Sequence, residues 1–183
     1  MLYIMRHGKT DWNVEKRLQG RTDVPLNEEG RQMARNAREE YKDINFDICY
    51  CSPLIRARET AELLLEGRNV PIVFDDRLME MSFGIYEGKA NCAKAPDSPI
   101  RTFFKKPEEY KGVENGETFD ELFKRTGDFL KEVIEPELAK GKDIIIVGHG
   151  AMNSSIICQV RGLSIKDFWS EDIENCKLKK ICE

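Results

Sequence analysis

Four short apolar runs along the chain predict β-strands. Each run is nearly continuous rather than alternating with polar residues, which is typical of strands covered by helices on both faces of a sheet. The four runs are Leu2–Met5, Phe46–Cys51, Val70–Phe74 and Ile144–Val147. A fifth run, Leu178–Cys182, predicts an edge strand near the C-terminus.

Helix signals lie between these runs. Asn27 is a good N-cap for a helix with Ala34, Ala37 and Tyr41 on one face. Ser52 is the predicted cap of a second helix, with Pro53 in its first position. The alternation of strands and helices favours an α/β fold in which one central sheet is covered on both sides.

Two further helices are predicted in the second half of the chain. Thr118 and Glu121 match a capping box, and Pro136 is expected to kink or end the helix that they begin. The last helix, from about Ala151 to Arg161, should end at Gly162. We therefore expect a three-layer α/β/α sandwich with a mainly parallel sheet, formed as one domain by residues 1–183.

The segment from Gly84 to Gly116 fits no regular element. It contains Pro96, Pro99 and Pro107, and the first two should form an exposed turn. A structureless loop of this length is uncommon inside a compact domain. We expect residues 84–116 to act as a lid or a binding loop.

Composition excludes several classes of protein. A net charge of −4 argues against nucleic acid as a partner, because a phosphate backbone requires a basic face. No apolar run has the length needed to span a membrane, so no membrane partner is expected. The six cysteines are scattered without a C-x-x-C pair, which indicates free thiols in a reducing, cytoplasmic compartment.

The two histidines of the chain occupy equivalent positions. His7 and His149 each follow a predicted strand and precede a glycine, although 142 positions separate them. The carboxyl ends of parallel strands meet at one edge of a sheet, where ligands bind. We therefore expect both imidazoles in one crevice, with glycine backbone able to approach a ligand and a helix N-terminus behind His149 that favours an anion.

Arginines add positive charge to this crevice. Arg6 adjoins His7, and Arg56 lies in the first turn of the helix predicted after Ser52. A guanidinium matches a phosphate group in planar, bidentate geometry. One alternative is that Arg56 is a surface residue paired with Glu59 or Glu62, and another is that each histidine is an ordinary loop residue. A zinc site is disfavoured, because the sequence has no recognisable ligand spacing.

Six motifs, in order and across nearly the whole chain, resemble those of the histidine phosphatase superfamily, in the branch that includes cofactor-dependent phosphoglycerate mutases and small phosphatases. They are Arg6-His7-Gly8-Lys9-Thr10, Leu18-Gln19-Gly20, the Ser52–Ala57 segment, Leu78-Met79-Glu80, Gly116-Glu117-Thr118 and Gly148-His149-Gly150.

The resemblance implies a role for each motif. His7 would be the nucleophile that becomes phosphohistidine, and Glu80 would be the proton donor. The residues that would hold phosphoryl oxygens are Arg6, Arg56 and His149, and further substrate contacts would come from Asn13, Gln19 and Gly20. The family uses no metal, and no cofactor is expected. Lys9 departs from the family pattern, in which Glu or Gln is usual, and leaves substrate preference open.

Three functions compete at this point. The leading one is a phosphatase that hydrolyses small phosphomonoesters through a phosphohistidine on His7. The second is a cofactor-dependent phosphoglycerate mutase. The third, from another class, is a non-catalytic module that binds a phosphorylated ligand, and the complete set of implied catalytic residues argues against it.

Overall fold

The computed structural model describes residues 1–182 and contains one five-stranded sheet. Its strands are β1 (Leu2–Arg6), β2 (Ile48–Cys51), β3 (Ile72–Phe74), β4 (Ile144–Gly148) and β5 (Leu178–Cys182). They follow the order β3-β2-β4-β1-β5 across the sheet. The first four are parallel, and β5 pairs antiparallel with β1, so the predicted mainly parallel sheet and its edge strand are confirmed.

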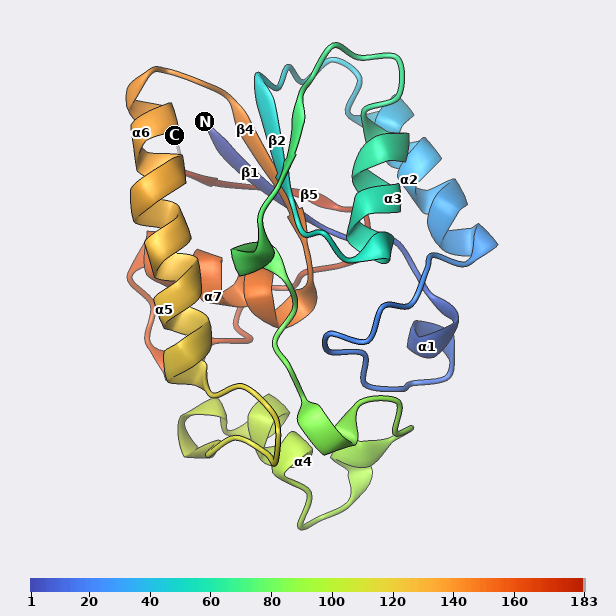
Figure 1. Ribbon diagram of the computed structural model, residues 1–183, viewed down its shortest axis with the longest axis vertical. Helices are drawn as coiled ribbons and strands as arrows, with labels where there is room; N and C mark the ends of the chain where they lie inside the picture. Colours follow the sequence, from blue (N-terminus) through green and yellow to red (C-terminus); the bar gives the residue numbers. More distant parts are fainter. Residues whose placement is uncertain (183) are drawn as a thin grey trace.

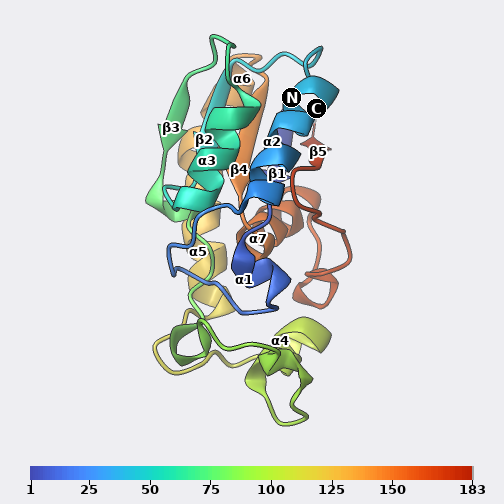
Figure 2. The same cartoon turned by 90° about the vertical axis from the view of Figure 1, so that its right-hand side faces the viewer.

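Helices cover both faces of this sheet (Figure 1). On one side lie α2 (Glu28–Glu40) and α3 (Ile55–Leu64). On the other lie α5 (Phe119–Phe129), α6 (Glu135–Ala139) and α7 (Gly150–Arg161). Figure 2 shows the layers edge-on, with α1 (Asp11–Val14) and α4 (Pro99–Lys105) beyond the carboxyl ends of the strands.

Alternate residues of each central strand enter two separate hydrophobic cores. In β1, Tyr3 and Met5 pack with alanines and leucines of α2 and α3, while Leu2 and Ile4 pack against α5 and α7. This two-sided burial explains the continuous apolar runs in the sequence. The three-layer α/β/α architecture that they predicted is confirmed.

Helix boundaries agree with the sequence at three predicted caps. Asn27 caps α2, Thr118 and Glu121 form the capping box of α5, and Gly162 ends α7 with φ +63°. One other expectation was wrong. Ser52 does not cap a helix, because α3 starts at Ile55 and Ser52 lies against a histidine instead. Near Pro136, where a kink or an end was expected, the helix is interrupted but does not end: α5 passes through a π-helical turn, Leu130–Ile134, into α6.

The segment 84–116 is more regular than its sequence suggested. Ser98 caps α4 with Pro99 in the first turn, and short 3₁₀ turns lie on either side of this helix. The expectation that nothing regular forms there was therefore wrong. Likewise, the strand predicted over Val70–Phe74 begins only at Ile72, and Val73 and Phe74 are exposed.

Within residues 1–182, no helix has both the length and the apolar character needed to cross a membrane. Equally, the described residues contain no group of three or more His, Cys, Asp or Glu side chains arranged to hold a metal ion.

Glycines determine how closely the loop after β1 can approach α2. A methyl group on Gly30 would overlap the carbonyl oxygen of Lys9, and one on Gly8 would overlap the carbonyl oxygen of Gly30. The glycine after His7 therefore permits a close contact between two backbone segments. This contact holds the loop that carries His7 against α2.

We expect Gly30→Ala to destabilise the protein, although alanine normally favours a helix over glycine by about 1 kcal/mol. The added methyl group meets fixed backbone, and such overpacking costs about 1–3 kcal/mol. Urea unfolding would measure the loss. Gly127→Ala in α5 is the matched control, because its methyl group would meet only the tip of the Gln159 side chain. Equal stability changes in the two variants would contradict this account.

Candidate active site

His7 lies at the carboxyl end of β1 with its ring orientation fixed. Its main-chain amide donates to the Gly148 carbonyl of β4 over 2.9 Å, and Asn175 Nδ2 donates to the His7 carbonyl over 2.6 Å. The ring Nδ1 lies 2.6 Å from the Gly8 carbonyl oxygen. A carbonyl only accepts hydrogen bonds, so Nδ1 of the neutral ring carries the proton and Nε2 keeps its lone pair.

His149 lies beside His7, as the sequence predicted. The two ring centroids are 5.2 Å apart, and Nε2 of His149 is 2.7 Å from the Ser52 hydroxyl oxygen. His149 is fully buried and is not among the residues that line the surface of the cleft described below. Its Nδ1 is the atom left for a ligand, since residues 1–182 provide no hydrogen-bond partner for it.

Arg6 and Arg56 bring two guanidinium groups to the same place. Arg56 is fully buried, and it donates to the Gly20 and Thr22 carbonyls over 2.6 and 2.9 Å. Arg6 donates to the Ile173 carbonyl over 3.3 Å. The alternative that Arg56 is a surface residue paired with Glu59 or Glu62 is wrong, because backbone carbonyls hold it in the interior.

Both arginines keep a donor free. The Nε atoms of Arg6 and Arg56 are buried and find no hydrogen-bond partner among the described residues. An unpaired buried N–H group costs about 1–3 kcal/mol. Unpaired guanidinium donors of two residues that line one cleft favour an anion such as a phosphoryl group there.

Burial and neighbouring charge set the protonation of the two histidines. Burial, followed by the positive charges of Arg56 and Arg6, lowers the pKa of His7 well below its usual value. Burial and the charge of Arg56 lower the pKa of His149 in the same way. Burial also lowers the pKa of Arg56 to about 10, which leaves this guanidinium charged at neutral pH. The site therefore combines neutral imidazoles with cationic arginines.

Glu80 occupies the N-terminus of α7. Its two carboxylate oxygens accept from the backbone amides of Met81, Ala151 and Met152 over 2.8, 3.2 and 3.0 Å. The anion that the sequence predicted at this helix N-terminus is thus the side chain of Glu80. The interaction places a carboxyl group beside Arg6 and Arg56, and the coulombic influence of Glu80 raises the pKa of each arginine against the larger effect of burial.

A second glutamate, Glu87, fixes the loop that contains Gly20, Arg21 and Thr22. Glu87 accepts from the backbone amides of Arg21, Thr22 and Phe83, and from the Thr22 hydroxyl, over 2.6–3.0 Å. Gly20 has φ +55°, and a side chain there would overlap Glu87. Glu87 and Arg56 therefore hold the same loop from two sides. Sequence reasoning did not assign Glu87 this role.

Asn13, Gln19 and Gly20 line the cleft, as expected of substrate contacts. The Thr10 hydroxyl lies 3.1 Å from the Asn13 side-chain carbonyl and 3.0 Å from that of Gln19. Each amide thus turns its oxygen to Thr10 and keeps its NH₂ group as a donor. Gly20 contributes its backbone, whose carbonyl is bound by Arg56.

Sequence reasoning missed the polar residues that support the histidines. Thr60 accepts from the Gly8 amide over 3.0 Å and donates to the Arg56 carbonyl within α3 over 2.7 Å, so it joins the loop after β1 to α3. Asn175 lies far along the chain and gave no sequence signal, although it forms a bridge with Arg6 beside β1. Ser52 and Thr60 could have been found as polar residues around a buried strand end.

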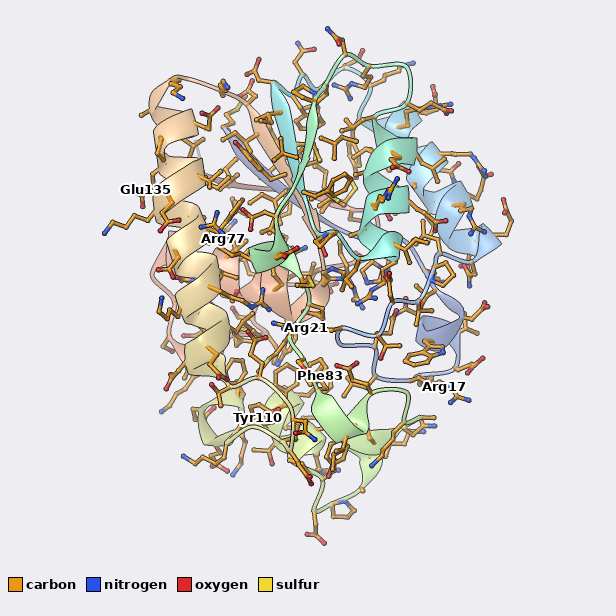
Figure 3. All side chains as sticks on the ribbon, viewed as in Figure 1. Arg17, Arg21, Arg77, Phe83, Tyr110 and Glu135 are labelled. Atoms are coloured by element: carbon orange, nitrogen blue, oxygen red, sulfur yellow. The ribbon has the colours of Figure 1, made fainter. Side chains whose placement is uncertain are left out.

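The site opens into a cleft of about 390 Å³ between the strand ends and segment 84–116. Arg6, His7, Arg56 and Glu80 lie on its lining. Phe83 and Arg21, labelled in Figure 3, lie where the sheet side of the molecule meets this segment. Arg21 also binds the Glu80 carbonyl over 3.3 Å and the Glu117 carboxylate at 3.5 Å, which secures the loop of Glu80.

Sequence comparisons match this chain to known phosphatases and phosphoglycerate mutases. A phosphatase of Bacillus subtilis, PhoE, is 35% identical over 87% of this chain and 76% of its own length. A 2,3-bisphosphoglycerate-dependent phosphoglycerate mutase of Gloeobacter violaceus is 33% identical over 96% of this chain and 82% of its own.

Solved structures match the same architecture. Bacillus stearothermophilus YhfR has a TM-score of 0.87 and 30% identity, covering 97% of this chain and 88% of its own. A phosphoserine phosphatase of Entamoeba histolytica in complex with 3-phosphoglyceric acid has a TM-score of 0.81 and 26% identity, over 97% and 87% of the two chains. A family model matches residues 2–182. The chain belongs to the histidine phosphatase superfamily, branch 1.

Proposed function

We propose that this protein is a phosphatase that hydrolyses small phosphomonoesters through a phosphohistidine on His7. The observation that carries the proposal is the neutral His7 ring, whose Nε2 is left free by the Nδ1 contact with Gly8, beside the unpaired Nε atoms of Arg6 and Arg56. A neutral imidazole is a competent nucleophile, and fixed donors around the phosphoryl oxygens stabilise charge in the transition state.

In the first step, His7 Nε2 forms a bond to phosphorus and the bond from phosphorus to the alcohol oxygen breaks. Arg6 and Arg56 bind the phosphoryl oxygens, together with the amides of Asn13 and Gln19. Glu80 gives its proton to the departing alcohol oxygen.

In the second step, water attacks the phosphohistidine. Glu80, now a carboxylate, accepts a proton from this water, the N–P bond breaks and inorganic phosphate forms. His7 returns to its neutral state with Nε2 unprotonated. His149, which packs against His7, is the remaining candidate for a phosphoryl contact through its Nδ1. No metal or cofactor is required in either step.

Hydrolysis is favoured over mutase activity by the charge of the segment that faces the cleft. A mutase must retain an intermediate with two phosphates and exclude water, which requires a closed and strongly cationic pocket. Residues 84–116 contain six basic and five acidic side chains, so their charges nearly cancel. We infer that this segment is a binding loop within a single catalytic domain rather than a tight seal.

Cytoplasmic location is part of the proposal. All six cysteines are free, and those of β2, Cys49 and Cys51, are buried fillers of the core. Free thiols of this kind suit a reducing compartment.

The proposal predicts catalytic turnover of phosphomonoesters with a phosphoenzyme as intermediate. Rapid quench with a labelled ester should trap an acid-labile, base-stable phosphoenzyme, and His7→Ala should lower kcat/KM at least about a thousandfold. Arg58→Gln is the control, because Arg58 is an exposed residue of α3 paired with Glu62. With 3-phosphoglycerate as substrate, isomerisation that depends on 2,3-bisphosphoglycerate and outruns phosphate release would establish the mutase instead.

The lowered histidine pKa values predict an unusual titration. Since the chain has only two histidines, NMR should show two imidazoles that stay neutral through pH 6.5 in the folded protein and titrate near their ordinary value in urea. The folded pKa values of both histidines lie below the unfolded ones. The free energy of unfolding is therefore unaffected by their protonation above about pH 6.5, and it decreases as the pH falls below this value, because the unfolded chain then binds protons that the folded protein does not. An imidazole with a pKa near 6.5 in the folded, ligand-free enzyme would contradict this model.

Glu80→Gln separates proton donation from binding. An alkyl phosphate has a poor leaving group and should lose about a hundredfold or more in kcat, whereas 4-nitrophenyl phosphate, whose phenolate leaves unaided, should lose about tenfold or less. Glutamine can keep only part of the contacts with Ala151 and Met152, so thermal unfolding of the variant serves as the control for folding. Equal losses on both esters would remove Glu80 from the acid role.

A further inference from the structure

The lining of the cleft combines two kinds of side chain. The polar groups of the proposed catalytic site are Arg6, His7, Arg56 and Glu80. Apolar and aromatic side chains form what we call the aromatic wall, which is available to the alcohol part of a substrate: Trp12, Leu18, Phe83, Ile100, Phe104 and Trp169. In the part of the chain that the structure describes, Glu80 is the only carboxylate on the lining.

Ring contacts and one hydrogen bond hold the aromatic wall together. Phe103 of α4 is fully buried and lies 4.9–6.3 Å, between ring centroids, from Phe83, Phe104, Tyr110, Phe119, Phe168 and Trp169. The indole of Trp169 donates to the Phe103 carbonyl over 3.0 Å, which fixes the orientation of its ring. Phe104 lies 5.3 Å from that ring and is 40% exposed, so α4 presents an aromatic face to the cleft.

Positive side chains are absent from this wall and lie instead at the exposed mouth. Among residues 1–182, the cations that line the cleft besides Arg6 and Arg56 are Lys16, Arg17 and Lys94, all of which are exposed. Arg17 is already bound to Glu15 and to the Gly88 carbonyl. A short substrate with a carboxylate close to its phosphate would place that second charge against aromatic rings, where desolvation disfavours it.

We infer that the preferred substrates are phosphomonoesters of bulky apolar alcohols, aromatic ones in particular, and not small carboxylated esters. This rests on the proposed phosphatase function and specifies its substrate class. A ring bound against the Phe104–Trp169 pair or Trp12 would gain from apolar burial and from offset or edge-to-face aromatic contacts.

The test compares esters of primary alkyl alcohols, which have similar leaving-group ability, so that differences in kcat/KM reflect binding of the alcohol part. The panel is 3-phenylpropyl phosphate, propyl phosphate, phosphoserine and 3-phosphoglycerate, with 4-nitrophenyl phosphate as a check of phosphatase function. We expect kcat/KM for the phenylpropyl ester to exceed that of the propyl ester about tenfold or more, which corresponds to about 55 Å² of apolar surface removed from water. It should exceed the two carboxylated esters by at least as much.

A substitution at Phe104 tests whether the preference for the phenylpropyl ester comes from the aromatic wall. Phe104→Ser should reduce the phenylpropyl-to-propyl ratio about tenfold. Phe74→Ser is the matched control, because Phe74 is an equally exposed aromatic residue on β3 that does not line the cleft, and its ratio should stay that of the wild type.

The outcomes distinguish this inference from the function on which it rests. Activity on 4-nitrophenyl phosphate with a preference for phosphoserine or 3-phosphoglycerate would overturn the substrate class and leave the phosphatase intact. An unchanged ratio in Phe104→Ser would also overturn it. Lack of turnover of every ester would reject the phosphatase function itself, and with it the substrate class.

Discussion

The structure depends most on two arginine charges that are drawn into the protein, where no carboxylate of residues 1–182 binds either guanidinium directly. Transfer of such a charge out of water costs several kcal/mol unless hydrogen bonds replace the lost hydration. For Arg56 those bonds come from the Gly20 and Thr22 carbonyls, and for Arg6 from the Ile173 carbonyl. The loops around the site therefore point backbone carbonyls at the two guanidinium groups, and these carbonyls replace the water that the arginines lose. The same charges, together with burial, keep His7 and His149 neutral.

Two carboxylates complete this arrangement by binding backbone amides. Glu80 joins its own loop to the first turn of α7, and Glu87 joins the loop of Gly20 to Phe83. Each contact links segments distant in sequence, and both lie at the carboxyl edge of the sheet. The positions of Glu80 and of Arg56 are thus set by hydrogen bonds to the backbone rather than by flexible ion pairs. This rigidity suits phosphoryl transfer, in which the protein mainly positions groups and stabilises charge.

The sequence predicted much of this from local patterns. Continuous apolar runs indicated a sheet buried on both faces, and His7 and His149 after two such runs indicated one shared edge. It could not show that Ser52 would bind His149, because that contact joins residues 97 positions apart. It also missed α4, a seven-residue helix whose stability comes from the ring contacts of Phe103 with distant aromatic residues. The sequence also could not show that His149 is fully buried, because the pattern of apolar positions does not tell how many neighbours pack around a residue.

The unpaired arginine donors of the cleft also affect how the product leaves the enzyme. The Nε atoms of Arg6 and Arg56, two residues that line the cleft, have no partner among residues 1–182, so a tetrahedral oxyanion that satisfies them gains binding energy. Inorganic phosphate carries the same oxygens as the phosphoryl group of an ester. Under the proposed phosphatase function, free phosphate should therefore compete with the ester for this site, and its concentration should limit the rate of turnover.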